Sequence, residues 1–441
     1  MTLFRYLIAG FLLMSAGCKQ YSDDYKTKAN RPEYLHGGMR RLTDIIRHDF
    51  FPPPVSSRIY AYSAIAAYEA LIPGFPDHKS LAGQLNDLQP GPQPEAGKDY
   101  CFPLASATAL LTVGKQLIFS EKEIQDLKET YFKEFEALNM PPDVYKRSTN
   151  YGEAVAKHII AWSKTDNYLQ TRSMPKFTID TDVPGRWQPT PPAYADALEP
   201  HWSKIRPWVM DSAAQFATEP PLPFSTDQKS AFYKQALEVY EIGRRHDSTE
   251  VATAWYWDDN PFAMQVVGHL SFARKKISPG GHWVNITAHA CRKANADMMR
   301  SAEAYVKTAC ALADGFIACW TAKYVYNLIR PESYINQLID PDWMPLIQTP
   351  PFPEHASGHS TISAAAATVL TDLFGDHFTF TDSTEMEFDI PARTYSSFYQ
   401  ASDEVGMSRL YGGIHYRRGN EAGIKCGRML GAYVARKIVC K

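Results

Sequence analysis

The sequence has few of the features that identify common classes of enzyme. None of its seven cysteines has a spacing typical of a zinc site. Residues 407–423, a stretch rich in glycine and arginine, contain neither an HExxH motif nor a CxxC pair. The formal net charge is only −2 over 441 residues, so no global field recruits nucleic acid or an acidic membrane surface. Any cationic site must therefore be local.

Long apolar runs are also absent beyond the start of the chain. Arg5 precedes an apolar run at residues 6–14, which is too short to cross a bilayer and ends in small residues before Cys18. This pattern predicts a signal peptide over residues 1–17 and a lipidated Cys18, which begins a tether over residues 18–40. An ordinary cleaved signal with an incidental cysteine is the alternative. The lipidated form would be exported and lipid-anchored in the bacterial cell envelope, with no other membrane contact.

The spacing of the other six cysteines does not indicate a set of disulfide bonds. They are Cys101, Cys291, Cys310, Cys319, Cys426 and Cys440. An exported chain could pair some of them. If Cys310 and Cys319 share one helix, they lie about 13 Å apart by helical rise, which is too far for a disulfide between them.

Segments with the alternation of a β-strand are scarce, and residues 378–383 are the best short candidate. Helical spacing of apolar residues is clear in three segments, residues 56–71, 227–245 and 296–324. Clusters among the 31 prolines mark loops between the helical segments. The chain is long enough to bury a large core. We therefore expect one all-α domain over residues 41–441, built from two packed helical bundles with a boundary near residues 225–250.

Two cationic residues share the apolar stripe of the last of these helices. The stripe consists of Val306, Ala309, Ala313, Phe316, Trp320 and Asn327. Lys323 and Arg330 fall on it as well, and Pro331 is predicted to end or kink the helix just after Arg330. Two buried cations are costly unless an anion compensates them, so the pattern favours an anion site. The alternative is that both side chains reach solvent or pair with acidic residues elsewhere.

Residues 351–370 lead from a proline-rich loop into an alanine-rich helix. Ser357 stands at the predicted N-cap, and Gly358 and His359 follow in the first turn. The free N–H groups and the positive dipole end of a helix N-terminus bind anions readily. Gly358 lets an oxyanion approach the backbone, and His359 can move a proton beside it. A plain helix cap with a surface histidine is the alternative for this segment alone.

A third candidate segment contains Arg409 and His415. Arg409 offers a planar fork for oxyanions, Gly412 and Gly413 leave space around it, and His415 offers a neutral ring nitrogen as nucleophile or ligand. Alone, a core histidine in a glycine-containing helix is the simpler interpretation. Together, the three segments predict a pocket for a tetrahedral oxyanion. No acidic cluster accompanies them in the sequence, so a divalent cation site is not expected.

Three motifs of the sequence resemble a known superfamily. The motifs are KYVYNLIRP (323–331), SGH (357–359) and SRLYGGIH (408–415). In order and spacing they are similar to the signature shared by type 2 phosphatidic acid phosphatases and vanadium-dependent haloperoxidases. Further segments resemble the exported bacterial haloperoxidase branch of that superfamily, namely residues 58–70, 255–261, 279–286 and 349–361. The likeness covers about residues 45–430.

The resemblance implies a vanadate site. The residues carried over to it are Lys323, Arg330, Ser357, Gly358, His359, Arg409 and His415. It implies that the three cations and the groups at 357–358 hold the oxygens, that His415 bonds the metal axially, and that His359 is the acid–base. Lys323 would polarise the activated oxidant, and Phe352 would line the approach of halide.

Two departures from the family pattern bear on the reaction. Ala356 stands where a proline is frequent, and Gly419 stands where the phosphatases have an aspartate that orients the second histidine. Glu421 is near in sequence, but nothing in the sequence assigns it that task. The missing carboxylate counts mildly against a phosphatase, in which His415 would have to attack phosphorus.

The resemblance leaves three functions open. The first is a haloperoxidase that uses hydrogen peroxide to oxidise halide, iodide or bromide above all, to hypohalous acid that reacts with an organic acceptor. The second is an acid phosphatase acting through a phosphohistidine at His415, with His359 protonating the leaving alkoxide. The third is a non-catalytic surface lipoprotein that binds an anion.

Overall fold

The computed structural model describes residues 21, 23–261, 263–267 and 270–441. The predicted signal peptide and Cys18 lie outside the described residues. The predicted tether does not extend to residue 40, because α1 (Tyr25–Ala29) and α2 (Glu33–His48) belong to the helical body. Tyr25 and Leu35 are buried in the main hydrophobic core. This burial offsets the conformational entropy that is lost when the segment becomes ordered.

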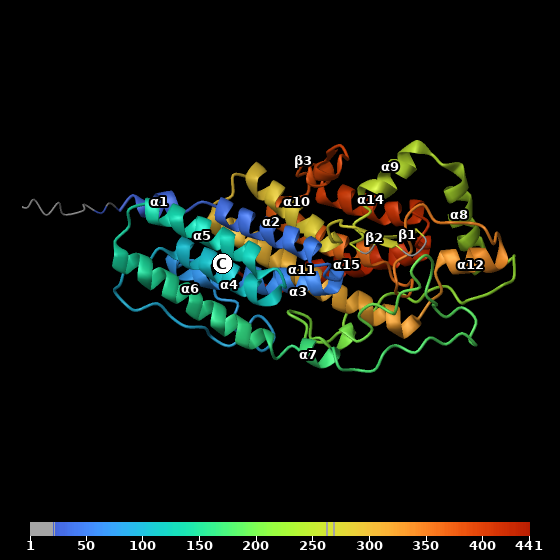
Figure 1. Cartoon of the computed structure of the whole chain (residues 1–441), viewed down its shortest axis with the longest axis horizontal. Coiled ribbons are helices and arrows are strands. Elements are labelled where there is room, and N and C mark those ends of the chain that lie inside the picture. Colours follow the sequence, from blue (N-terminus) through green and yellow to red (C-terminus); the bar gives the residue numbers. More distant parts are fainter. Residues whose placement is uncertain (1–20, 22, 262, 268–269) are drawn as a thin grey trace, which may run out of the picture.

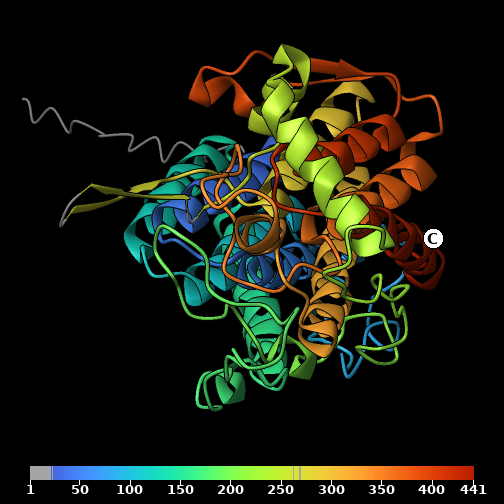
Figure 2. The same ribbon diagram turned by 90° about the vertical axis from the view of Figure 1, so that its right-hand side faces the viewer.

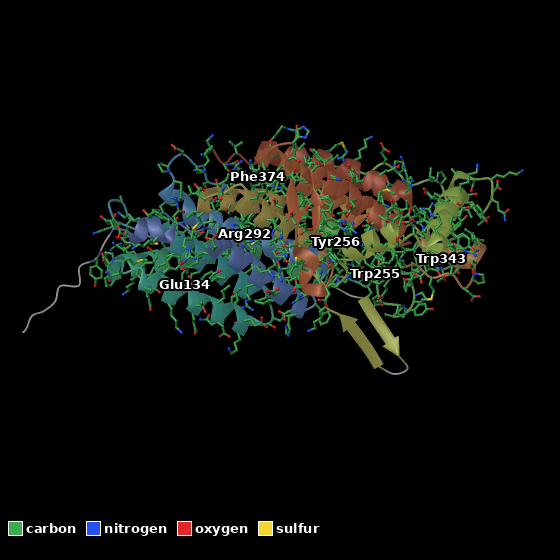
Figure 3. All side chains as sticks on the ribbon, turned by 90° about the horizontal axis from the view of Figure 1, so that it is seen from above. Glu134, Trp255, Tyr256, Arg292, Trp343 and Phe374 are labelled. Atoms are coloured by element: carbon green, nitrogen blue, oxygen red, sulfur yellow. The ribbon has the colours of Figure 1, made fainter. Side chains whose placement is uncertain are left out.

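Four further helices pack with α2 into a first bundle. They are α3 (Pro53–Leu71), α4 (Phe102–Leu117), α5 (Glu121–Ala137) and α6 (Pro142–Ser163). Nearly every residue of α3 is buried, which is typical of a central helix rather than an amphipathic surface helix. The segment predicted to be helical at 56–71 lies entirely within α3. Glu134 of α5 marks one end of the elongated molecule, and Trp343 lies at the other end (Figure 3).

The second bundle contains α10 (Pro279–Lys293), α11 (Met298–Tyr326), α13 (Gly358–Phe374), α14 (Phe398–Tyr411) and α15 (Arg417–Lys437). The long helix α11 packs against α3 of the first bundle and against α13 of the second, so the two bundles share it (Figure 1). The predicted all-α fold of two packed helical bundles is confirmed.

Small residues bring α13 and α15 close together. Gly423, Gly427 and Gly431 recur every four residues and therefore lie on one face of α15. A Cβ atom at any of the three would overlap backbone carbonyl oxygens of the Ser357–Ala365 region of α13 and its cap. This close packing fixes the N-terminus of α13, where the predicted anion site lies.

The remaining elements are short and lie around the bundles. The helices are α7 (Tyr168–Thr171), α8 (Ala231–Arg245), α9 (Ser248–Tyr256) and α12 (Pro331–Leu338), and the 3₁₀ turns are η1 (Ile72–Gly74), η2 (Trp202–Lys204) and η3 (Thr384–Phe388). The predicted boundary near 225–250 falls on α8, which packs against α12 and α14 around a second, smaller hydrophobic cluster. The expected boundary therefore falls inside a helix that packs on the second bundle through α14.

Two antiparallel strand pairs complete the fold. The strand predicted at 378–383 contains β3 (Phe380–Asp382), which pairs with β4 (Arg393–Tyr395). The pair β1 (Ala263–Val267) and β2 (Leu270–Arg274) extends from the side of the helical body, as Figures 2 and 3 show.

Two further expectations concern the described residues. No helix among them is long and apolar enough to cross a membrane. Each of the six cysteines that follow Cys18 is buried and unpaired, so the described part of the chain contains no disulfide.

Candidate active site

Lys323 and Arg330 come from two elements rather than one helix. The prediction that both lie on one helical stripe is wrong, because α11 ends at Tyr326 and Asn327 adopts the left-handed conformation at its C-cap (φ 46°, ψ 45°). Arg330 is the extended residue before α12, and Pro331 begins that helix instead of ending the previous one. Both side chains are nevertheless fully buried.

The Lys323 ammonium holds the loop that precedes α13. Its Nζ donates to the carbonyl oxygens of Pro353 and Glu354, each at 3.0 Å, and of Ala356 at 2.5 Å. Burial, with the neighbouring Arg330 charge, lowers the pKa of Lys323 to about 7. Three carbonyl dipoles therefore stabilise this cation, but no carboxylate hydrogen-bonds to it.

Arg330 crosses from that loop to the segment that carries His415. Its Nε donates to the carbonyl oxygen of Phe352 at 2.8 Å, and its Nη1 donates to that of Ile414 at 2.8 Å. Its Nη2 is buried without any hydrogen-bond partner. Burial lowers the pKa of Arg330 to about 10, so the guanidinium is still charged at neutral pH. A free buried N–H of a cation is a strong donor to an anion.

The tautomer of His415 follows from its two neighbours. Nε2 lies 3.1 Å from Nη1 of Arg330, and Nδ1 lies 2.8 Å from Oε1 of Glu354. A guanidinium can only donate, so Nε2 must be the unprotonated nitrogen and Nδ1 must donate to the carboxylate. Burial and the nearby cations hold the pKa of His415 well below its usual range. The ring is therefore neutral, and its unprotonated Nε2 is directed at the Arg330 guanidinium.

Glu354 takes the place of the carboxylate that the sequence lacks at position 419. A side chain at Gly419 would overlap the Glu354 carboxylate, so only one of the two positions can carry a carboxylate. Oε1 of Glu354 also accepts the backbone N–H of Tyr416 at 3.1 Å. The sequence left open which residue orients His415 in place of the missing aspartate, and the structure places Glu354, not Glu421, beside it. Sequence reasoning missed Glu354 because 61 residues separate it from His415.

The N-terminus of α13 has the expected geometry. Ser357 is the N-cap residue, and its hydroxyl oxygen accepts the backbone N–H of Ser360. A Cβ at Gly358 would lie 3.2 Å from the Trp320 ring, so the glycine keeps a tight space open beside Lys323. His359 is partly exposed, but its Nε2 is buried and has no hydrogen-bond partner. Burial first, then the neighbouring cations, lower the pKa of His359 well below its usual value.

Arg409 approaches from α14 and is bordered by acidic residues. Its Nη2 donates to the carbonyl oxygens of Trp257, at 2.5 Å, and Ala254, at 3.3 Å. Burial lowers its pKa to about 10, and the charges of Asp258 and Asp259 oppose this shift. Two acidic residues that the sequence analysis did not assign to the site thus lie beside Arg409. The sequence alone could not place these two aspartates beside Arg409, because they lie some 150 residues before it.

One cleft leads to these residues from the surface. Its volume is about 30 Å³, and it is lined by Phe352, His359 and Arg409, together with Asp258, Asp259 and mainly apolar residues. The Phe352 ring lies 4.9 Å from both the Lys323 ammonium and the Arg330 guanidinium and packs against Trp320. The structure thus places Phe352 between the cleft and the buried cations.

Every residue assigned to the site from the sequence lies in this region. Lys323, Arg330 and His415 are linked by contacts through the 352–356 loop, and the charges of Arg409 and His359 act on His415. Within the described residues, the arrangement offers three cations, helix N–H groups, the unprotonated Nε2 of His415, and a buried Nε2 of His359 that has no hydrogen-bond partner. A tetrahedral oxyanion is the ligand that such a set accommodates.

Comparison with known proteins agrees with this chemistry. Residues 303–439 match a family model described as the VCPO second helical-bundle domain. The fold is that of a bacterial vanadium-dependent chloroperoxidase, in holo form (TM-score 0.69, 15% identity, 88% of this chain and 93% of that one) and apo form (TM-score 0.67, 15% identity, 88% and 94%). No curated protein matches the chain.

A further solved structure is much more similar. It is the crystal structure of a bacterial vanadium-dependent iodoperoxidase, with a TM-score of 0.88 and 48% sequence identity over 93% of this chain and 97% of that one. Such identity over almost the whole length shows common descent as well as a common fold. The chain belongs to the vanadium-dependent haloperoxidase family, whose members are peroxidases with vanadate as their cofactor.

Proposed function

We propose that this protein oxidises iodide, and bromide less readily, with hydrogen peroxide to the hypohalous acid. One observation carries the proposal. The unprotonated Nε2 of His415 accepts from the buried Arg330 guanidinium in a chain that is 48% identical to a bacterial vanadium-dependent iodoperoxidase. An organic acceptor for the oxidised halide is part of the proposal.

The residues present fit vanadate. The buried Nη2 of Arg330 and Nε2 of His359 both lack partners, and burial lowers the pKa of all three cations. An oxyanion among these groups would satisfy the unpaired donors and offset the cost of burying like charges. Lys323, Arg330 and Arg409 would neutralise its oxygens.

The remaining groups would fix the position of the anion. The hydroxyl of Ser357 and the backbone N–H of Gly358 would donate to oxygens, and Nε2 of His415 would be the nitrogen ligand. Glu354 keeps the proton on Nδ1 and thereby keeps Nε2 unprotonated for that role. Bound vanadate supplies the electrophilic centre that activates hydrogen peroxide towards halide.

His359 and the cleft carry the rest of the reaction. His359 is neutral over the ordinary pH range, since its pKa is well below its usual value, so it can accept the proton that leaves hydrogen peroxide. The mostly apolar lining of the cleft beside Phe352 removes water from an approaching halide. Iodide is the largest and least hydrated of the common halides, so desolvation costs it least.

A phosphatase is the second candidate, and one observation keeps it open. The carboxylate of Glu354 supports His415 as the missing aspartate would have done, so the sequence argument against an attacking histidine no longer holds. The preference for haloperoxidase therefore rests on the similarity of almost the whole chain to a bacterial vanadium-dependent iodoperoxidase.

We further propose that the protein is exported and attached to the membrane through a lipid on Cys18. The motif after the apolar run at 6–14 supports this. In a Gram-negative host, the Cys18→Ala variant should appear in the soluble envelope fraction, whereas the unchanged chain should remain with membranes. Equal membrane association of both would overturn the proposal.

The proposed activity is tested by its dependence on vanadate. The purified chain, stripped of bound anions, should oxidise iodide only after vanadate is added, and inorganic phosphate at the same concentration should give no activity. Excess phosphate added before vanadate should slow activation, because both anions need the same cations. Iodide oxidation that is equally fast without vanadate would overturn the proposal.

A further inference from the structure

A second group of buried titratable residues lies behind the wall of the cleft. It consists of Asp259 after α9, His282 in the first turn of α10, Asp382 at the end of β3, and Glu385 in η3. We call it the Asp259 cluster. Each of the four side chains is at most 2% exposed. In Figure 1, β3 lies next to α10 and α14, above the middle of the molecule.

His282 is the centre of the cluster. Its Nδ1 lies 3.0 and 3.1 Å from the two carboxylate oxygens of Asp259, and its Nε2 lies 2.7 Å from Oδ2 of Asp382. Oε1 of Glu385 lies 3.9 Å from the same Nδ1. Three carboxyl groups therefore surround one imidazole. Its two ring nitrogens can each hydrogen-bond to one of them, so one carboxyl group is left over.

The burial of the Glu385 carboxyl group is not explained by its hydrogen bonds. Neither of its carboxylate oxygens has a hydrogen-bond partner among the described residues, although the residue is 1% exposed. Burial, together with the charge of Asp259, raises its pKa to about 8. A buried carboxylate with no donor to either oxygen is costly. With this raised pKa the Glu385 carboxyl keeps its proton at neutral pH, and a cation that displaces the proton would give its oxygens a partner.

We propose that Asp259, Nδ1 of His282 and Glu385 bind one divalent first-row metal ion, Zn²⁺ or Mn²⁺. One ligand atom from each of the three residues lies within 4.8 Å of the other two. Ligands about 2.1 Å from such an ion lie about 3.0–3.4 Å from one another. The two separations from Nδ1 of His282, 3.0 Å to Asp259 and 3.9 Å to Glu385, bracket that range, and metal binding would draw the Glu385 carboxylate inward.

The donor set selects the class of ion. One imidazole nitrogen with two carboxylates suits Zn²⁺ or Mn²⁺, whereas Ca²⁺ and Mg²⁺ prefer ligands that are all oxygen. The ion replaces the proton on Nδ1 of His282 and any proton on Glu385, so binding releases protons. Two ligand carboxylates then balance its charge.

Asp382 would orient the ligand histidine. It accepts the N–H of Nε2, which leaves Nδ1 to the metal, and this is the usual arrangement of a carboxylate behind a metal-bound histidine. The hydroxyl of Tyr256, at 2.8 Å, and the backbone N–H of Thr384, at 3.0 Å, hold Asp382 in turn. The Trp257 ring stacks on His282 with a centroid distance of 4.5 Å and fixes the plane of the imidazole.

The ion would stabilise the wall of the active-site cleft. Asp259 lines the cleft beside His359 and Arg409. A metal bond from Asp259 to α10 and η3 would tie the segment after α9 to the second bundle. The proposal concerns a structural ion, and it stands whether or not the chain oxidises halide.

Metal content and thermal stability test the proposal. The full chain, incubated with Zn²⁺ or Mn²⁺ and then dialysed, should hold about one equivalent of the ion, counted separately from vanadium. Its melting temperature should fall when a chelator removes the ion and should recover on return of Zn²⁺ or Mn²⁺ but not of Mg²⁺. Glu385→Gln should abolish both the bound equivalent and the shift in melting temperature.

A neighbouring residue provides the matched control. Glu387 lies two positions on and pairs with Arg40 and Arg47 at the surface, so Glu387→Gln should keep the bound ion. Loss of the ion in both variants, or its retention in Glu385→Gln, would overturn the assignment of the ligands. The unsubstituted protein provides a test that does not depend on the folding of Glu385→Gln. If it holds no ion and melts at the same temperature with Zn²⁺, with Mn²⁺ and with a chelator, the proposed site does not exist.

Discussion

Nδ1 of His415 lies 2.8 Å from Oε1 of Glu354, a carboxylate that reaches the histidine from the loop before α13. The same carboxylate fills the space that a side chain at Gly419 would need. The support for His415 therefore comes from a different element than the family signature leads one to expect. The loop that carries it is itself held by Lys323, so the cation cage and the orientation of the histidine depend on each other.

Removal of the Glu354 carboxylate should weaken vanadate binding more than it weakens folding. In Glu354→Ala nothing fixes the proton on Nδ1, and we expect the affinity for vanadate to fall about 10–100-fold, the usual cost of losing such a partner. Glu354→Gln keeps an acceptor for the N–H and should lose less. Equilibrium dialysis with measurement of bound vanadium checks both variants.

Gly419→Asp provides the complementary variant. Alone it should destabilise the protein, because the new side chain overlaps Glu354. Combined with Glu354→Ala it should recover part of the vanadate affinity. Equal affinity of Glu354→Ala and the unchanged chain would show that Glu354 does not orient His415.

The two histidines of the site should behave differently when replaced. His415→Ala should lose bound vanadium, because the cations alone hold the anion loosely, and excess vanadate should restore little turnover. His359→Ala should retain vanadium but lose about 10²–10⁴-fold in peroxidase turnover, the usual contribution of an acid–base group. Vanadium content and iodide oxidation, measured on the same samples, separate the two roles. Loss of vanadium from both variants to the same extent would contradict the assignment.

The close contact of α13 and α15 should make Gly427 sensitive to a single methyl group. A Cβ at this position overlaps the carbonyl oxygen of Thr361 in the neighbouring helix, so Gly427→Ala should cost about 1–3 kcal/mol of unfolding free energy. Gly280→Ala is the control, since its Cβ would meet nothing closer than 3.9 Å. Denaturant unfolding of both variants checks the prediction, and equal stability would contradict it.

Stability should fall with acid below about pH 6.5, partly through His36. This residue is buried, its Nδ1 lies 2.7 Å from the Tyr305 hydroxyl, and burial lowers its pKa to about 3. The unfolded chain therefore binds a proton at a higher pH than the folded one, and each pH unit in this window costs about 1.4 kcal/mol. Unfolding free energy measured at pH 7 and 5.5 should show a smaller difference in His36→Gln. The exposed His377→Gln should leave the difference unchanged.

The sequence predicted the helices well where the spacing of apolar residues alone decides the secondary structure. The apolar spacing of residues 56–71 and 227–245 and the turn signals between helices required no tertiary information. The end of α11 was misjudged, because the preference of Asn327 for a left-handed cap competes with an apolar pattern that continues to Arg330. A local cap ended the helix where the periodicity alone did not.

The partners of the site residues could not be predicted in the same way. Glu354 reaches His415, and Asp259 reaches His282, only once distant segments pack together. A lone acidic residue in a loop carries no signal of its own in one sequence. The motif residues themselves could be found because their types and order identify a family, whereas their supporting carboxylates lie at positions that its signature does not specify.

The most direct test compares two reactions on one preparation. The purified chain, loaded with vanadate, should oxidise iodide with hydrogen peroxide at ordinary enzymatic rates, whereas the vanadate-free chain should hydrolyse phosphate esters slowly or not at all. His359→Ala should remove the iodide activity without removing vanadium. A chain that oxidises neither iodide nor bromide when loaded, but hydrolyses phosphate esters at ordinary enzymatic rates, would contradict the account and make His415 a phosphoryl acceptor.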